Sequence, residues 1–335
     1  MKPLHGLHVV EFATVGGVPF CAWLLAQSGA HVTRVAAPQP RELGVPVDDA
    51  GDIGMWDREA VVLDLKSDAQ RAHALALIES ADVLIEGFRP GVMERLSLGP
   101  QDCHARNPRL VYARMSGWNR GGPWARHAGH DINYIAMTGA LHACGPEGVP
   151  LNLIGDIGGG ALYLAFGIAA ALQARAGSGR GCVVDAAMAD GALHMLSAIY
   201  GRLGVGAWND APASNVIDGG VPWYRTYRTA DGRHMAVGAI EERFYLNFLH
   251  VLGLDAQRLP ARNERTRWNE LAGAFAARFR TADMATWAAR FENAEACVTP
   301  VLTLVEARGH PVTRAAFTVR DEVPLPQAVP NFSPA

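Results

Sequence analysis

The amino-terminal half of the chain alternates short β-rich runs with helical patterns, and this alternation limits the possible folds most strongly. The β-rich runs cover residues 7–14, 31–38, 60–66, 82–88 and 109–117. Helical patterns separate several of them, at 18–30, 67–81 (with Ser67 as the expected N-cap) and 89–96 (with Pro90 in the first turn). Strands and helices that alternate in this way form βαβ units around a parallel sheet. We therefore predict an α/β fold with a large, doubly wound parallel-sheet domain.

The pattern changes after residue 185, where a second domain is expected. One long helical pattern covers 185–204, and two β-rich runs flank Asp231 and Gly232, a pair that strongly favours a hairpin turn. Further elements are expected as helices at 241–254, 265–280 and 283–293 and as an irregular, proline-rich tail at 322–335. The predicted domains are a large one formed by 1–190 and 301–335, a linker at 191–214, and a small α+β domain at 215–300.

Composition and charge narrow the class of protein. The 335-residue chain has a net charge of -3, without the basic block that indicates nucleic-acid binding. Its five scattered cysteines contain no C-x-x-C pair, which favours reduced thiols over disulfides or a zinc site. The apolar run 161–174 is shorter than the roughly 18 residues that span a bilayer, and the start lacks a signal-peptide pattern. We therefore expect a cytoplasmic protein that neither spans a membrane nor binds nucleic acid.

A single carboxylate interrupts the apolar stretch "LNLIGDIGGGALYLAFGIAAALQA" at 151–174. Asp156 follows a short apolar run, interpreted as a strand, and precedes Gly158, Gly159 and Gly160 at the start of a predicted helix. One interpretation is a helix N-cap, since an aspartate there accepts backbone N–H groups. The other is a functional acid, with glycines that let a ligand approach the backbone. A dinucleotide loop is disfavoured because G-x-G-x-x-G is not matched.

Other polar positions are also candidates for chemistry, each with a plainer alternative. His130 follows the β-rich run 109–117, and ligands of α/β sheets bind at the carboxyl ends of the strands. A lone histidine is also common as a structural residue. Arg89 and Arg95 lie at a predicted helix start, either to hold phosphate groups or simply to be solvated. Glu241 stands at another predicted helix start, where a solvated carboxylate is common.

Five segments, taken in order, resemble one protein family. They read "EGFRPGVMERLSLGP", "GWNRGGPWARHAGHDINYIAMTG", "PLNLIGDIGGG", "GGVPWYRTYRTADGRHMAVGAIE" and "ACVTPVLTLVEA". This succession resembles the α-methylacyl-CoA racemase branch of the family III CoA transferases. The motifs "GHDINY" and "GAIE" are typical of that branch, whereas "RPG" and the Asp-glycine segment are shared more widely.

The resemblance implies a fold, a reaction and a set of site residues. It implies two subunits threaded through each other as interlocked rings, with the site between the large domain of one subunit and the small domain of the other. His130, supported by Glu241, would be one base and Asp156 the other, and the glycines after Asp156 would leave room for a thioester. The matching positions near the thioester and the coenzyme are Asn152, Tyr134, Arg95 and Arg89. No metal or redox cofactor is expected, because coenzyme A is part of the substrate.

The sequence departs from the family pattern where the coenzyme is handled. Ala37 precedes Pro38 where the family usually has an arginine, and only Arg58 remains of a basic cluster before the third strand. Acidic and small residues occupy the rest of that cluster, namely Asp57, Glu59 and Ala60. Lost hydrogen bonds to phosphate weaken binding by about 1.5–3 kcal/mol each. The neighbouring cations that could compensate are Arg34, Arg41 and Lys66.

Three functions remain open at this point. The first is a racemase or epimerase of 2-methylacyl-CoA thioesters, which moves a proton between two bases through an enolate. The second is a CoA transferase in which Asp156 attacks the thioester as a nucleophile. The third is a non-catalytic protein that keeps the fold while its binding of the coenzyme decays.

Overall fold

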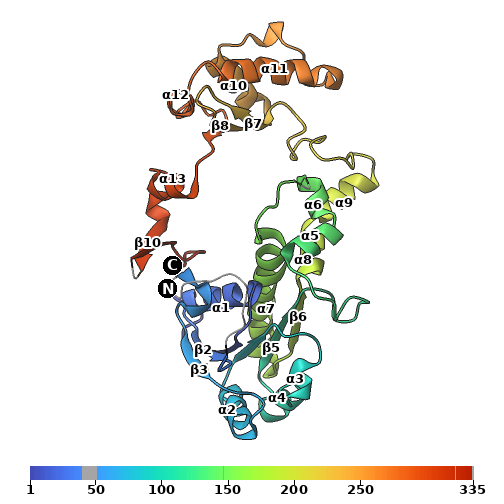
Figure 1. Cartoon of the computed structure of the whole chain (residues 1–335), viewed down its shortest axis with the longest axis vertical. Helices are drawn as coiled ribbons and strands as arrows, with labels where there is room; N and C mark the ends of the chain where they lie inside the picture. Colours follow the sequence, from blue (N-terminus) through green and yellow to red (C-terminus); the bar gives the residue numbers. More distant parts are fainter. Residues whose placement is uncertain (40–50, 146, 321, 334–335) are drawn as a thin grey trace. The chain divides into compact units, whose positions relative to one another are not determined.

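The computed structural model describes residues 1–39, 51–145, 147–320 and 322–333. Residues 40–50, among them the candidate cation Arg41, lie outside the described residues. The chain forms two compact units (Figure 1). Unit 1 comprises Met1–Leu141, Val149–Ala198 and Thr318–Ala335, and unit 2 comprises His142–Gly148 and Ile199–Phe317. The predicted domain boundaries stay a prediction, since a cluster of contacts does not by itself define an independently folding domain.

Unit 1 is built on a six-stranded parallel sheet with the strand order β3-β2-β1-β4-β5-β6. Its strands are β1 (His8–Phe12), β2 (His31–Ala36), β3 (Glu59–Val62), β4 (Val83–Glu86), β5 (Val111–Ser116) and β6 (Val183–Ala187). This sheet confirms the predicted α/β class. The strand order reverses between β1 and β4, and such a switch point is where open α/β sheets bind ligands, at the carboxyl ends of the strands.

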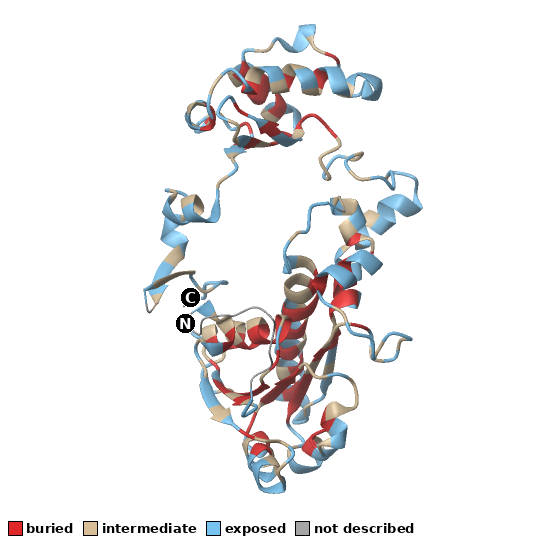
Figure 2. Cartoon of the chain, in the orientation of Figure 1, coloured by how far each residue is buried: buried red, intermediate tan, exposed pale blue. Residues whose placement is uncertain are grey.

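Helices cover both faces of this sheet, as the continuous apolar runs of the strands require. Alternate residues of β4 point to opposite faces, so Val83 and Ile85 join one core cluster while Leu84 joins the other. The first cluster packs against α1 (Gly17–Gln27) and α7 (Tyr163–Ser178). The second packs against the helices α2 (Asp68–Glu79), α3 (Val92–Arg95) and α4 (Pro100–Arg106). Figure 2 shows the resulting buried core along the strands and the facing sides of α1 and α7.

The predicted helix starts are only partly right. Ser67 occupies the N-cap of α2, but its side chain makes no capping hydrogen bond. Helix α3 begins at Val92, two residues after Pro90, because Gly91 adopts a left-handed conformation with φ of 85° that cannot belong to the helix. Arg95 therefore lies in the last turn of α3 and not at a helix start beside Arg89.

Two predictions in the middle of unit 1 are wrong. The run before Asp156 is not a strand: Leu153–Leu162 forms a π-helix, η3, that continues into α7. The single helix predicted over 185–204 is instead the end of β6 followed by α8 (Met188–Met195) and α9 (Ser197–Gly204). Residues 183–187 form a strand because they pair in parallel with β5. Five residues are too few to show a helical or a strand period, so the local sequence did not reveal this pairing.

The continuous helical run 153–178 is long and apolar enough, by length and composition alone, to cross a membrane, and among the described residues it is the one helix that is. Leu164, Ile168 and Ala171 of this run belong to the core cluster that packs on the sheet. The same test is passed by core helices, so the expected absence of a membrane span stays a prediction.

Unit 2 contains the three-stranded antiparallel sheet β7-β8-β9. Its hairpin of β7 (Tyr224–Arg228) and β8 (His234–Gly238) has the predicted turn at Asp231 and Gly232, and β9 (Val298–Pro300) adds a strand that was not predicted. The three predicted helices are present as α10 (Glu242–Leu252), α11 (Trp268–Phe279) and α12 (Met284–Phe291), and they pack on the sheet through an aromatic core. The remaining elements are α5 (Asp131–Met137), α6 (Ala140–Cys144), α13 (Leu304–Gly309), β10 (Phe317–Arg320) and β11 (Val323–Pro326). Strand β11 corrects the irregular tail expected at 322–335: it pairs with β10 in a two-stranded sheet, where missing proline N–H groups are tolerated at an edge.

Candidate active site

The candidate site lies at the carboxyl edge of the parallel sheet, around the switch point between β1 and β4. Gly16 and Gly17 follow β1, Arg89 follows β4, and the segment 117–130 follows β5 and ends at His130. Loops that follow neighbouring parallel strands emerge at the same edge, which explains why positions far apart in the sequence meet here.

Asp156 lies in the first turn of the π-helix η3, and Asn152, not Asp156, occupies the N-cap. The N-cap interpretation of Asp156 is therefore wrong. The backbone N–H of Asp156 donates to Asp131 Oδ1 at 2.7 Å, and Asn152 Nδ2 donates to Asp156 Oδ2 at 3.3 Å. Desolvation of the half-buried carboxyl raises the pKa of Asp156, the negative charge of Asp131 adds to this rise, and Asn152 and His130 oppose it.

The glycines around Asp156 allow backbones to pack closely. A Cβ atom on Gly17 would lie 2.3 Å from the Asp156 carbonyl oxygen, and one on Gly16 would lie 3.2 Å from Asp156 Oδ2. Gly16 also has a φ of 82°, which L-residues with a side chain rarely adopt. Gly158, Gly159 and Gly160 are likewise enclosed: a Cβ on each would lie within 3 Å of α8 or of a neighbouring side chain. Packing of the chain on itself, rather than room for a ligand, therefore accounts for these three glycines.

His130 is the N-cap residue of α5, and its side chain is exposed. Its backbone N–H donates to Asn133 Oδ1 at 3.0 Å, which fixes the start of the helix. A protonated His130 imidazole lowers the pKa of Asp156, so the two groups lie close enough to interact electrostatically. The structure thus places the imidazole of His130 within electrostatic range of an acid that lies 26 positions further along the chain.

Tyr134 supports the segment that carries His130. Its hydroxyl donates to the Gly129 carbonyl oxygen at 2.5 Å, and its buried ring packs edge-on against Trp118 with centroids 4.9 Å apart. A Cβ on Gly117 would lie 2.3 Å from the Tyr134 hydroxyl, so the ring needs both glycines. Burial, with the charge of Asp156 as a further cause, raises the pKa of Tyr134 to about 12. The predicted contact of Tyr134 with a thioester stays a prediction.

The predicted coenzyme-binding cations differ in their surroundings. Arg89 is exposed and lies near enough to Tyr134 to influence its pKa, and Arg95 is exposed at the end of α3. Lys66 is exposed between β3 and α2. Arg34 is half-buried on β2, where its Nη1 contacts Met55 Sδ at 3.4 Å and its Nε has no hydrogen-bond partner among the described residues.

Arg58, the remnant of the family's basic cluster, is committed to the fold. Its side chain is 1% exposed and pairs with Glu11, itself fully buried, at 2.6 Å. The guanidinium also donates to the carbonyl oxygens of Ile53, Trp56 and Pro19. Four of the five N–H donors of Arg58 are thus bound within the fold, which leaves this side chain poorly placed to hold a phosphate. Burial raises the pKa of Glu11 to about 7 despite this partner.

Glu241 belongs to unit 2, where it is the N-cap residue of α10. Its two neighbours are both held by Arg262, which donates to the Ile240 carbonyl oxygen at 2.7 Å and pairs with the Glu242 carboxylate. Arg262 in turn stacks over the ring of Tyr245 at 4.5 Å. The turn that presents Glu241 is thus rigidly held, and the predicted support of His130 by Glu241 stays a prediction.

Sequence reasoning overlooked several residues that shape this site. Asp131 was visible inside "GHDINY" as an acid next to His130, and the pair Gly16–Gly17 was visible shortly after a predicted strand. Glu86 and Arg120 gave no signal, because a charged residue at a strand end or in a loop is usually solvated. Their burial follows only from the tertiary structure.

The fold and the site define an α/β protein with a candidate acid–base pair at the carboxyl edge of a parallel sheet. The chain belongs to CoA-transferase family III, which it matches over residues 4–334. It is 41% identical to α-methylacyl-CoA racemase of Mus musculus, with 98% of this chain and 86% of the relative covered. It is 42% identical to the human α-methylacyl-CoA racemase, with 95% of this chain and 83% of the relative covered. A CAIB/BAIF family protein from Brucella suis shares the fold, with a TM-score of 0.85, 23% identity, and coverage of 100% of this chain and 93% of that chain.

Proposed function

We propose that this protein is a racemase or epimerase of 2-methylacyl-CoA thioesters. The observation that carries the proposal is the electrostatic influence of His130 on a half-buried Asp156 at the carboxyl edge of the sheet. The similarity to two mammalian proteins named as α-methylacyl-CoA racemases supports the same reaction. Acyl-CoA is then the substrate, and the protein works in the cytoplasm on lipid-derived thioesters without a separate cofactor.

The proposed reaction inverts the carbon next to the thioester carbonyl. One base, His130 or Asp156, removes the α-proton from one face, and the bonding electrons move onto the carbonyl oxygen as an enolate. The other group, which carries a proton at that moment, returns it to the opposite face. General acid–base catalysis of this kind contributes about 100 to 10,000-fold for each group. Glu241 is proposed to support His130.

The surroundings of Asp156 suit this alternation between acid and base. A carboxyl with an ordinary pKa is almost never protonated near neutral pH and would be a poor proton donor. Desolvation and the buried Asp131 raise the pKa of Asp156 toward neutral pH, while Asn152 stabilises the carboxylate form. The two forms therefore lie closer in free energy than they would in water.

The other predicted residues are proposed to bind the thioester and its coenzyme. Asn152, which already contacts Asp156, and Tyr134 lie next to the acid–base pair. The cations proposed to hold the coenzyme are Arg89, Arg95, Lys66 and Arg34. Exposure of Arg89 and Lys66 supports this role, because a phosphate has to reach the guanidinium or ammonium group.

We also propose the intertwined homodimer that the family resemblance implies. Exposed apolar side chains include Leu162 at the end of η3, Phe166 one turn later in α7 and Leu193 on α8, and Phe166 is 75% exposed. Large exposed apolar residues in neighbouring turns are typical of surfaces that a partner covers. Sedimentation of the purified protein at the mass of a dimer is the expected result.

Deuterium wash-in tests the reaction. The protein is incubated with a 2-methylacyl-CoA epimer in deuterated water, and mass spectrometry follows the α-position. We expect both epimers to gain deuterium and to approach the same mixture. Absence of exchange, together with intact binding of the thioester by calorimetry, would contradict the racemase.

A CoA transferase is the second candidate, because the matching family is named for transferases. Asp156 would then attack the thioester carbonyl, expel the coenzyme thiolate and form a mixed anhydride. Hydroxylamine traps such an anhydride as a hydroxamate on the protein. Trapping at Asp156 after addition of an acyl-CoA, with transfer of CoA to a second carboxylic acid, would reverse the ranking. The non-catalytic alternative predicts that calorimetry detects no binding of acyl-CoA at all.

A further inference from the structure

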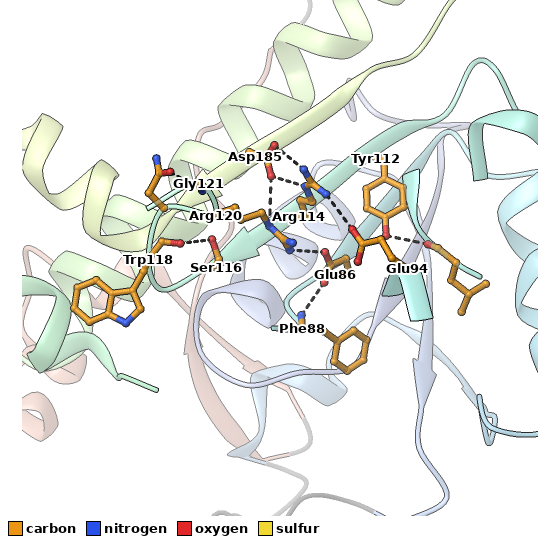
Figure 3. Close-up of polar contacts among 12 residues, drawn as sticks. Glu86, Phe88, Glu94, Tyr112, Arg114, Ser116, Trp118, Arg120, Gly121 and Asp185 are labelled. Atoms are coloured by element: carbon orange, nitrogen blue, oxygen red, sulfur yellow. Dashed lines mark hydrogen bonds and ion pairs between the residues drawn. The ribbon is translucent and has the colours of Figure 1, made fainter. Parts of the chain in front are cut away.

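A network of charged side chains, centred on the buried Glu86, lies at the carboxyl edge and does not include the acid–base pair. Figure 3 shows this network, which joins the end of β4 to β5, β6 and the segment that follows β5. Its charged members are Glu86, Glu94, Arg114, Arg120 and Asp185. Their charges sum to one excess negative charge, so the network is not simply a set of neutral pairs.

Glu86 connects two loops through its two carboxylate oxygens. Its Oε2 accepts the backbone N–H of Phe88 at 2.7 Å, and its Oε1 accepts Nη2 of Arg120 at 2.8 Å. The first bond fixes the turn that leads to Arg89, and the second fixes the start of the segment that ends at His130. The side chains of Glu86 and Arg120 are 2% and 14% exposed, so water competes little for these bonds.

Arg120 is held on its other side by the sheet. Its Nε lies 3.5 Å from Asp185 Oδ1, and Asp185 also pairs with Arg114 of β5. Arg114 extends the network to Glu94, one residue before Arg95. Strand β5, strand β6 and α3 thus form a fixed frame on which Arg120 is seated.

The segment between Arg120 and His130 is fixed at its other end as well. Trp118 precedes Arg120 and packs against Tyr134, whose hydroxyl holds Gly129. Asn119 Nδ2 donates to Asp190 Oδ2 of α8 at 2.6 Å. Residues 121–129 themselves are mostly exposed, so the link from Arg120 to His130 runs through the packing of Trp118 on Tyr134 and the hydrogen bond from Tyr134 to Gly129.

We propose that Glu86 is a positioning residue that sets the Arg89 turn and the His130 segment in one fixed relation to each other. The inference rests on the proposed function and deepens it, since it assigns the alignment of coenzyme and base to one buried carboxylate. Glu86 does not touch the reacting atoms in this assignment. Its carboxylate form makes both bonds at full strength, and its protonated form keeps one acceptor and loses the ion pair with Arg120.

The ionisation of Glu86 gives this assignment a pH signature. Burial raises the pKa of Glu86 to about 7, and the charge of Arg120 opposes the rise. The other groups that face it are the Phe88 N–H, the guanidinium of Arg114, the carboxylate of Glu94 and the hydroxyl of Tyr112. Above that pH the carboxylate clamps Arg120, and below it a neutral carboxyl resembles a glutamine in charge and shape.

Glu86→Gln in the full-length protein tests the proposal, with deuterium wash-in and the KM for the thioester as readouts. At about pH 8.5 we expect the exchange rate to fall by about 10- to 100-fold and KM to rise, because small misplacements of positioned groups have effects of this size. At about pH 5.5 wild type and variant should converge, because wild-type Glu86 is then neutral too. Arg120→Lys, which keeps the charge, should lose less exchange than Arg120→Gln.

Asp82→Asn is the matched control. Asp82 directly precedes the same strand and pairs with Arg175 at 2.9 Å, with side chains 29% and 8% exposed, at the opposite edge of the sheet. The Asp82→Asn substitution should lower the melting temperature and leave the exchange rate and KM at their wild-type values at every pH.

Four outcomes are decisive. A Glu86→Gln variant with wild-type rates at about pH 8.5 overturns the proposal, and so does a ratio of wild-type to variant rates that stays constant with pH. If Glu86→Gln is too unstable to purify, Arg120→Lys is compared with Arg120→Gln, and equal losses of exchange in these two variants overturn the proposal. Wild-type protein that exchanges no α-proton in any thioester rejects the proposed function itself, and this result is obtained before any variant is made.

Discussion

The two edges of the parallel sheet differ in how completely their polar groups are paired. At the amino edge, Asn107 Nδ2 donates to two carbonyl oxygens, and Asp82 accepts both the His8 backbone N–H and Arg175. At the carboxyl edge, by contrast, buried side-chain atoms lack hydrogen-bond partners. In the part of the chain that the structure describes, all such atoms lie in the carboxyl halves of strands or in the segments after them: Glu11 Oε1, Thr14 Oγ1, Arg34 Nε, Trp118 Nε1, Arg120 Nε and Asp131 Oδ2.

This difference between the two edges indicates that one contributes mainly to stability and the other mainly to chemistry. Buried polar groups are normally paired, and each unpaired one costs free energy of folding. A fold keeps such groups where they serve a purpose, so the paired amino edge stabilises the domain and the carboxyl edge holds reactive groups. Substitutions at the two edges should therefore affect different measurements.

The largest effect is expected from removing the acid–base pair. Asp156→Asn and His130→Ala should each lower racemisation by at least about 100- to 10,000-fold, because each group provides one of the two proton transfers. Each variant should keep some exchange from the one epimer whose face the surviving base serves. Wash-in measured from each pure epimer checks this. Equal losses of exchange from both epimers in both variants would show that the two residues do not act on opposite faces.

A smaller effect is expected from Gly17→Ala. The new Cβ would meet the Asp156 carbonyl oxygen, a backbone atom that cannot give way cheaply. Overpacking of this kind costs about 1–3 kcal/mol, and it should displace Asp156 and lower the exchange rate about tenfold. Gly177→Ala near the end of α7 is the control, because its Cβ would enter open space and alanine favours the helix. Unchanged activity in Gly17→Ala would place the reacting acid elsewhere.

A shift in pH dependence, rather than a large loss of rate, is expected from Asn152→Ala. The Asn152 amide stabilises the Asp156 carboxylate, so its removal raises the pKa of Asp156 further. The epimer that Asp156 deprotonates is the one that still exchanges in His130→Ala. Asp156 must be ionised before it can deprotonate this epimer. The acid limb of the pH profile of kcat/KM, measured with this epimer, should therefore move to higher pH. A limb that stays in place would mean that it reports another group.

The smallest effect on activity is expected at the amino edge, from Asp82→Asn. Loss of the charge weakens the bond to Arg175 and should lower the free energy of unfolding by about 1.5–3 kcal/mol at most, since Asp82 is partly exposed. Denaturant unfolding measures this loss, and deuterium wash-in should show none. A parallel loss of exchange would remove the distinction between the two edges.

Much of the α/β fold follows from local patterns in the sequence. The strands β1, β2, β4 and β5 are short apolar runs with β-branched residues, and these preferences act within a few residues. Strands β6, β9 and β11 were missed because their pairing partners decide them: β6 lies beside β5, and β11 beside β10. A local pattern carries no information about such a partner.

The candidate site likewise has a part that the sequence predicted and a part that it did not. The resemblance of "GHDINY" and "LIGDIGGG" to one family points to His130 and Asp156, and the imidazole of His130 lies close enough to lower the pKa of Asp156. The sequence did not reveal that Arg58 pairs with Glu11, nor that Glu86 is buried beside an Arg120 side chain that is only 14% exposed. The burial of a residue is the sum of its contacts with distant segments, so it cannot be predicted from that residue alone.

The sequence by itself determined the family and the parallel sheet and pointed to the two groups that are proposed to carry protons, because apolar periodicity and short motifs are local properties of a chain. The tertiary structure alone decided which charges are buried, which glycines the packing of the π-helix on α1 and α8 requires, and how Glu86 links two loops. Those features depend on distances between segments far apart in the chain, and only the folded state fixes such distances.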